Sequence, residues 1–296
     1  MTRPLILLDG FPSSGTLKVQ AALAHLMAGW IETLPELEAV IPEILAFDHL
    51  PDSSADFPAN VLFTHHLPLP ALLAHGVTKL IYVIRDPIDS AISIANWMIT
   101  HRLDYGLATE DEIREGRLAL IDFYLRNGTH LEFVVGGYGT WNVHALSWLQ
   151  AGLPIPTMVI DFSDLKRRSE EIVRQMADFI GAPCSDEIVA GALRNWDIET
   201  TRRMEEDVIA RKHVCRLYTP TRDVAYARGW RYHGSGGSNY GKDLLTAEQW
   251  EIAAGVFGPT CKMLGRPLQR RVEPTAPSAR GNPGWSLSSL LGRAGK

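Results

Sequence analysis

Short apolar runs of strand length recur along the chain, and segments with the period of an α-helix separate most of them. The runs cover Leu5 to Leu8, Val61 to Thr64, Leu80 to Ile84 and Met158 to Ile160. Alternation of such runs with helices favours a parallel sheet with helices packed on its faces. The sequence therefore predicts an α/β fold.

Composition narrows the class of protein further. The chain has 296 residues and 46% hydrophobic content, which suits one sizeable α/β domain, expected over residues 1–272. Residues 273–296 are rich in Pro, Ser, Gly and Arg and are predicted to be a disordered tail. A net charge of -5 gives no reason to expect nucleic acid or a polybasic membrane contact.

Cysteine content and the N-terminal run favour a cytoplasmic protein. The three cysteines are far apart and odd in number, so they suggest neither a disulfide framework nor a metal site. The apolar run at Leu5 to Leu8 stops at Asp9, which is too short for a signal peptide or a membrane-spanning helix. We interpret it as a buried strand.

A glycine-containing loop follows that first strand. Gly10-Phe-Pro-Ser-Ser-Gly15-Thr16 precedes an apolar helical segment, and its two glycines have the spacing of a P-loop. Because a helix N-terminus offers free N–H groups and a positive dipole end, this order is suited to a phosphate. Thr16 stands where a Walker P-loop has lysine, which disfavours an ordinary NTPase. The alternative is a plain strand-to-helix turn, in which Pro, Ser and Gly are common.

A second candidate phosphate site lies at the end of the third run. Arg85 ends that predicted strand, and Asp86-Pro87 is a typical start for a helix that carries Asp89 and Ser93. Arg85 can bind a phosphate with its guanidinium fork while Ser93 adds a hydroxyl. The alternative is that Arg85 only pairs with Asp86 or Asp89 at the surface.

Together these segments resemble the sulfotransferases that use 3'-phosphoadenylyl sulfate (PAPS). Phe11 to Lys18 is similar to the family's Tyr-Pro-Lys-Ser-Gly-Thr-Thr-Trp loop, and Arg85 with Ser93 matches its Arg and Ser eight residues apart. Four further segments resemble family motifs in the correct order: Val61 to Pro68, Tyr138 to His144, Asp161 to Leu165, and Gly234 to Lys242 with Leu245 to Gln249. The resemblance spans residues 4 to 265.

This resemblance implies a P-loop-type sulfotransferase fold, PAPS as the donor, PAP as the product, and no metal. It implies transfer of a sulfuryl group to a hydroxyl or amine of a small acceptor, with a histidine as general base. The strand and its Thr-His pair select His65, whereas Leu67-Pro68 selects His66. We favour His65, because strand phase fixes the direction of a side chain. His144 is expected to make a structural hydrogen bond.

The resemblance also assigns a set of residues to donor binding. They are Ser13, Ser14, Gly15, Thr16, Leu17, Lys18, Arg85, Ser93, Ser235 and Gly236.

The chain departs from the family at two cationic positions. Ser13 replaces the catalytic lysine of the loop, and Gly234 and Ser235 stand where the family has basic residues for the 3'-phosphate. Lys18 is a candidate replacement, with a solvated helix lysine as the alternative. Lys242, Arg228 and Arg231 are further candidates near the C-terminal loop.

The departures leave three functions open. They are an active sulfotransferase, a nucleotide-binding homologue with impaired catalysis, and a P-loop kinase-like phosphoryl-transfer enzyme. We expect a small-molecule acceptor that is partly apolar, no nucleic acid and no membrane partner, and the sequence leaves a homodimer open. Aromatic and apolar residues that either line the acceptor pocket or belong to the core are Trp97, Met98, Tyr105, Phe123, Tyr138, Trp141 and Trp230.

Overall fold

The computed structural model describes residues 5–43, 61–63, 76–101, 105–149, 153–215, 217–232 and 245–268, with the backbone alone at 61–63. Four strands form one parallel sheet in the order β2-β1-β3-β4. They are β1 (Leu5–Asp9), β2 (Val61–Phe63), β3 (Val77–Ile84) and β4 (Thr157–Asp161). The predicted parallel α/β architecture and its four strands are confirmed within these ranges. The predicted tail at 273–296 lies outside the described residues.

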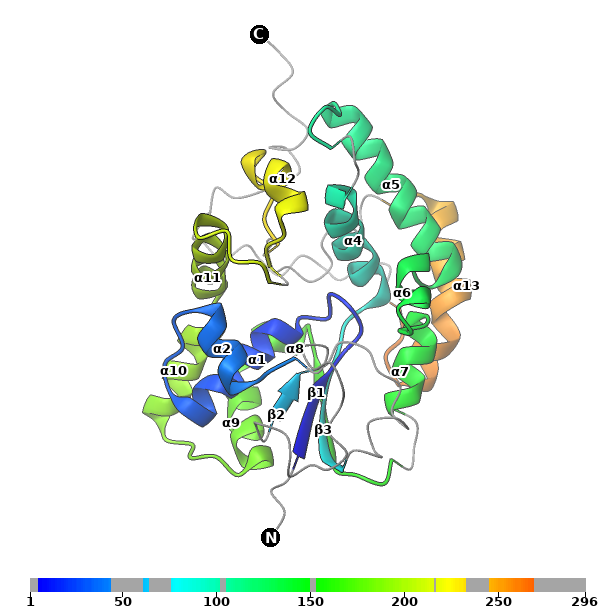
Figure 1. Ribbon diagram of the computed structural model, residues 1–296. Coiled ribbons are helices and arrows are strands. Elements are labelled where there is room, and N and C mark those ends of the chain that lie inside the picture. Colours follow the sequence, from blue (N-terminus) through cyan, green and yellow to red (C-terminus); the bar gives the residue numbers. More distant parts are fainter. Residues whose placement is uncertain are drawn as a thin grey trace.

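Helices cover both faces of the sheet (Figure 1). Their bounds are α1 (Thr16–Ala28), α2 (Leu34–Val40), α4 (Pro87–Met98), α5 (Glu110–Asn127), α6 (Leu131–Val135), α7 (Trp141–Leu149), α8 (Asp164–Arg167), α9 (Ser169–Ile180), α10 (Asp186–Trp196), α11 (Ile198–Ala210), α12 (Asp223–Ala227) and α13 (Ala247–Met263). Short 3₁₀ helices are η3 (Ile99–His101) and η4 (Pro220–Arg222).

Local sequence signals account for where several helices begin. Asp86 caps α4 by accepting hydrogen bonds from the amides of Ile88 and Asp89, and Pro87 occupies the first turn. Thr246 and Gln249 form the predicted capping box at the start of α13. A similar box formed by Thr109 starts α5. Because each box satisfies amides that have no partner inside the helix, these boundaries are encoded locally.

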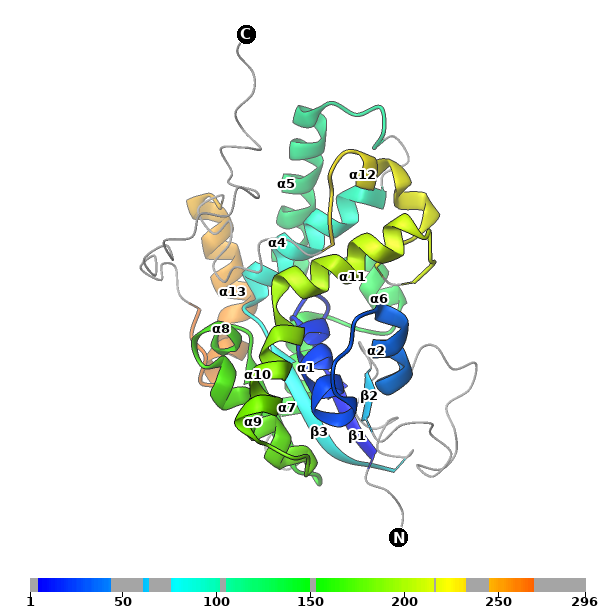
Figure 2. The same cartoon turned by 90° about the vertical axis from the view of Figure 1, so that its left-hand side faces the viewer.

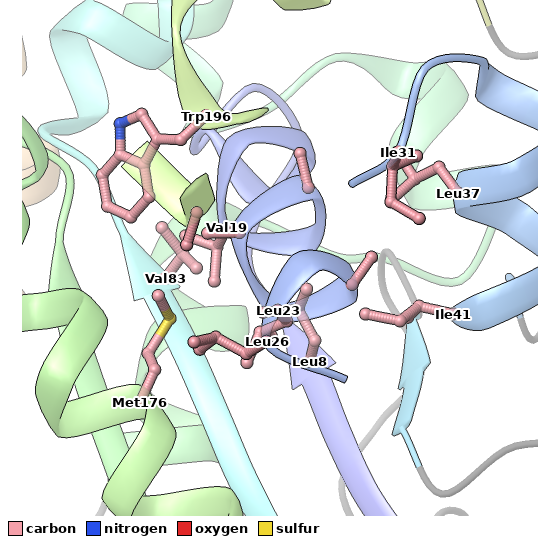
Figure 3. Packing of buried hydrophobic residues seen from close by; sticks show 14 of the residues in the cluster. Leu8, Val19, Leu23, Leu26, Ile31, Leu37, Ile41, Val83, Met176 and Trp196 are labelled. Carbon is pink, nitrogen blue, oxygen red and sulfur yellow. The ribbon is translucent and has the colours of Figure 1, made fainter. Parts of the chain in front are cut away.

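The period-2 alternation of the central strand divides the core into two layers. Ile6 and Leu8 of β1 belong to the cluster packed under α1, α2, α9 and α10. Leu5 and Leu7 belong to the cluster packed under α4, α5, α7 and α13. Figure 3 shows the first cluster, where Leu23 of α1 lies near Leu8 of the sheet and Met176 of α9. Both faces of the sheet are therefore apolar, as continuous hydrophobic strands require.

Two helices lie beyond the carboxyl ends of the strands. Figures 1 and 2 show α11 and α12 on this side, facing α4 across the end of β1. In a parallel sheet this edge is where ligands bind, outside the ends of the strands. None of the helices in the described ranges is long and apolar enough to cross a bilayer.

We predict that Gly191 is required for the close packing of α1 on α10. A Cβ atom added at Gly191 would clash with the imidazole of His25, which Asn195 holds through a 2.8 Å contact between Nδ1 and Oδ1. Gly191→Ala should lower the free energy of unfolding by about 1–3 kcal/mol. The test is urea denaturation of both single variants, Gly191→Ala and His25→Ala, and of the double variant. The double variant should lose less free energy of unfolding than the two single variants lose together, and additive losses would contradict the clash.

Candidate functional site

The loop between β1 and α1 has a backbone that only particular residues tolerate. Gly15 has φ 95°, and a Cβ atom there would lie 2.5 Å from the ring of Phe162. A Cβ atom at Gly10 would lie 2.6 Å from the carbonyl oxygen of Val83. Ser13 also has a positive φ, 64°, which is uncommon for a residue other than glycine. The two predicted loop glycines are thus fixed by close backbone and side-chain contacts.

The first turn of α1 is open to an anion. Its N-cap is Gly15, which has no side chain to accept a hydrogen bond from the helix, and the first turn has no acidic residue. Ser14, 1% exposed, has a buried Oγ atom without a hydrogen-bond partner, and Thr16 is also buried. Amide groups and hydroxyls therefore gather at the positive end of the helix dipole.

Arg85 is tied directly to this loop. It follows β3, and its Nη1 donates a 2.8 Å hydrogen bond to the carbonyl oxygen of Ser13. Its guanidinium also lies 4.3 Å from the centroid of the Phe162 ring, a cation–π contact. Burial lowers the pKa of Arg85, and the charges of Asp89 and Asp86 oppose that effect. The interpretation that Arg85 is only a surface partner of these aspartates is therefore wrong.

Lys18 lies in the first turn of α1 and is half-buried. Burial lowers its pKa to about 8, and the positive charges of Lys166, Arg85 and Arg202 lower it further, while Asp197 raises it. Side chains lean toward the N-terminus of a helix, which brings Lys18 toward the loop. The alternative of a solvated helix lysine is wrong. The sequence did not single out Lys166 or Arg202, because they come from α8 and α11, far along the chain.

A buried polar layer supports the loop from below. Asp9 is 0% exposed and accepts a 2.5 Å hydrogen bond from the amide of Gly10, while its other carboxyl oxygen has no hydrogen-bond partner. His144 lies 3.8 Å from Asp9 and makes a 2.8 Å hydrogen bond with the hydroxyl of Tyr82. This hydrogen bond confirms the structural role expected for His144.

Burial sets the protonation states in this layer. It raises the pKa of Asp9 well above its usual value, and the Gly10 hydrogen bond opposes the rise. Burial also lowers the pKa of His144 to about 3. A neutral carboxyl beside a neutral imidazole avoids the cost of burying unpaired charge. The loop therefore rests on a layer in which burial favours the neutral forms of both groups.

The other predicted site residues have fewer contacts with the loop between β1 and α1, or lie outside the described residues. Ser93 is half-buried on α4, two turns after Arg85. Leu17 is half-buried and packs against the first core cluster. His65, His66, Gly234, Ser235, Gly236 and Lys242 lie outside the described residues.

Arg228 and Arg231 are engaged away from the loop. Arg228 pairs with Glu110, and Arg231 pairs with Glu206 at 2.5 Å. Each also donates to backbone carbonyl groups. The contacts of these two arginines therefore fix the segment around α12.

The residues predicted to line the acceptor pocket or belong to the core differ in how far they are buried. Trp141 is 2% exposed and belongs to the core, and Phe123 is 45% exposed on α5. The ring of Trp97 instead stacks on Phe133, with centroids 6.4 Å apart, and Phe133 contacts Phe11 of the loop at 6.1 Å. Phe11 and Phe133 are buried in the second core cluster, so these contacts anchor the loop and the half-buried Trp97 to the core.

Metal ligands do not gather in the described ranges, where no group of three His, Cys, Asp or Glu side chains could hold a metal ion.

Comparison with known proteins agrees with this geometry. A family model described as the sulfotransferase domain matches residues 3–252. A "Flavonol sulfotransferase-like" protein of Flaveria bidentis is 30% identical over 170 residues, covering 55% of this chain. The alignment covers 48% of that protein, so the chain matches about half of its length.

Two solved structures share the fold. A mouse sulfotransferase, SULT7A1 complexed with PAP, has a TM-score of 0.58 and 17% identity, covering 89% of this chain and 88% of its own. Retinol dehydratase in a complex with retinol and PAP has a TM-score of 0.57 and 15% identity, covering 88% and 82%. At these identities the likeness establishes the fold alone.

We predict that Asp9 makes stability depend on pH. A carboxyl with a raised folded pKa stabilises the protein fully below its unfolded pKa, about 4, and this contribution is lost as pH rises toward the folded value. Asp9→Asn keeps the shape and cannot ionise. Between pH 5 and pH 8, the free energy of unfolding of the wild type should therefore fall relative to the variant, by up to about 1.4 kcal/mol per pH unit. Urea denaturation of both proteins tests this, and parallel pH profiles would contradict a neutral Asp9.

Proposed function

Because the chain belongs to the sulfotransferase-domain family, we propose that it is an enzyme that transfers a sulfuryl group from PAPS to a hydroxyl or amine of a small acceptor. The observation that carries the proposal is the half-buried Lys18, which lies among the positive charges of Arg85, Lys166 and Arg202 beside the open first turn of α1. Like charges brought together in a partly desolvated site repel one another. A phosphate there relieves the repulsion, as the donor's phosphates would.

The transfer itself needs three contributions. The bond between sulfur and the phosphate oxygen breaks as a new bond forms from the acceptor oxygen or nitrogen to sulfur, and the acceptor's proton goes to a base. We assign the base to His65, with His66 as the alternative. The amides at the start of α1 and the nearby cations stabilise the charge that develops on the leaving phosphate. Lys18 and Arg85 supply positive charge in the absence of a lysine at position 13.

A second candidate is a homologue that binds the nucleotide without catalysis. Ser13 stands where the family has a lysine, and this replacement favours the second candidate. A neutral hydroxyl forms a weaker hydrogen bond to a phosphate oxygen than a charged ammonium does. Sulfate transfer to any acceptor would exclude it. A kinase-like activity is disfavoured by Thr16 at the position of the Walker lysine.

We predict that the chain binds PAP in calorimetric titration without magnesium and that Lys18→Met weakens this binding. Loss of one charge-assisted hydrogen bond costs about 1.5–3 kcal/mol, which is about a tenfold to hundredfold loss of affinity. Lys212→Met is the matched control, because Lys212 is exposed and pairs with Asp223. No PAP binding by the wild type at millimolar ligand would overturn the proposed function.

We predict that His65→Ala abolishes sulfate transfer from labelled PAPS while PAP binding stays within threefold of wild type. The physical reason is that the base acts on the acceptor's proton and not on the nucleotide. His66→Ala is the control on the opposite face of the predicted strand and should retain turnover. The reverse pattern would assign the base to His66, and full activity in both variants would contradict a histidine base.

A further inference from the structure

Arg222 is a buried cation without an acidic partner. It ends η4, is 4% exposed, and forms no ion pair with any residue in the described ranges. Its Nη1 atom is buried and has no hydrogen-bond partner. Arg228 and Arg231, the next two arginines along the chain, both pair with glutamates. The planar guanidinium of Arg222 presents N–H donors in a fixed fork.

The groups in direct contact with the guanidinium of Arg222 are neutral. Its guanidinium lies 5.1 Å from the ring of Trp97 and 5.9 Å from that of Trp230. Its Nε and Nη2 atoms lie 3.2 and 2.9 Å from Nε2 of His101. Burial lowers the pKa of His101, and the charge of Arg222 lowers it further, so the imidazole adds no positive charge. Burial raises the pKa of Tyr226 to about 12, although the charge of Arg222 lowers it, so this phenol also stays neutral.

Two acidic residues act on the groups around Arg222, and the first, Glu205 of α11, is buried, accepts a hydrogen bond from the amide of Tyr232 and raises the pKa of Tyr226 through its charge. The second, Glu132 of α6, raises the pKa of His101 through its charge, although its effect is smaller than those of burial and Arg222. It is exposed, so solvent screens its charge. The aromatic rings around Arg222 attract the guanidinium but cannot satisfy its N–H donors. Among the described residues, no carboxylate forms an ion pair with Arg222.

The position of Arg222 connects it to the proposed site of transfer. Trp97 lies one helical turn after Ser93 on α4, and its ring continues through Phe133 to Phe11 of the loop. Figure 1 shows α12, which follows Arg222 directly, across from α4 beyond the ends of the strands. Phe133 and Phe11 are buried core residues, so a ligand would approach Arg222 along Trp97 and Trp230, the two half-buried rings beside its guanidinium. The rings on two sides of Arg222 favour an acceptor whose own ring can pack against Trp97 and Trp230.

We propose that Arg222 binds a carboxylate on the acceptor, which makes the acceptor a hydroxylated aromatic carboxylic acid. This inference rests on the proposed function and names its substrate class. The guanidinium matches a carboxylate in a bidentate geometry, and the low dielectric of the buried site strengthens the pair. His101 is exposed, so its imidazole is the group that an incoming carboxylate displaces from Arg222. A neutral ester of the same acid gains none of this interaction.

The test compares 6-hydroxy-2-naphthoic acid with its methyl ester. The wild type bound to PAP should bind the acid in calorimetry, and kcat/KM for sulfate transfer should be at least 10-fold higher for the acid. Arg222→Leu should lower kcat/KM for the acid about 100-fold, mainly through KM, and leave the ester within threefold. Arg211→Leu is the matched control, because Arg211 is an exposed arginine paired with Asp207 at the end of α11. This control should leave the ratio of kcat/KM for the acid to kcat/KM for the ester unchanged.

Two further measurements separate the possible failures. Binding of the acid that depends on Arg222 without any sulfate transfer would contradict the proposed function and retain this inference. If Arg222→Leu does not fold, His101→Ala replaces it, and its acid-to-ester ratio should equal or exceed that of wild type. An equal preference for acid and ester in the wild type, or a loss of that preference in His101→Ala, would overturn the assignment to Arg222.

Discussion

The parallel pairing of β1 with β3 is the constraint on which the site depends. Leu8 pairs with Ile81 and Asp9 with Tyr82, so the two strands end at the same edge of the sheet. The loop after β1 and Arg85 after β3 therefore meet, although more than 70 residues separate Ser13 from Arg85. Their hydrogen bond holds a loop that has positive φ angles at Ser13 and Gly15. Tertiary contacts must maintain such a backbone, because left-handed conformations cost a residue other than glycine about 1–2 kcal/mol.

The layer below the loop explains why it can be rigid as well as polar. Asp9 is oriented by the amide of Gly10, and His144 by the hydroxyl of Tyr82. Burial favours the neutral forms of Asp9 and His144, which lie beneath the candidate phosphate site. A charged aspartate there would oppose anion binding in a medium of low dielectric. A layer whose groups favour their neutral forms thus opposes an anion at the loop less than a charged layer would.

In the described part of the chain, positive charge gathers near the loop and again at Arg222. Near the loop, Lys18, Arg85, Lys166 and Arg202 come from α1, the end of β3, α8 and α11. Arg222 is separate from this group and is enclosed by Trp97 and Trp230. In the proposed reaction, the first group holds the phosphates of the donor and Arg222 holds the far end of the acceptor. Trp97 and Trp230, which flank Arg222, would position the acceptor.

The sequence by itself determined the elements and the order of the motifs. Apolar runs located the four strands, and Asp86-Pro87 and Thr246 located two helix starts, because these signals act over a few residues. The glycine loop and Arg85 were identified as candidate phosphate contacts for the same reason. Only the tertiary structure decided how Lys18, Lys166 and Arg202 interact, because charges from distant elements have no common signal along the chain. It likewise decided that Arg228 and Arg231 are paired while Arg222 is not, since burial and ion pairing depend on which surfaces the fold brings together.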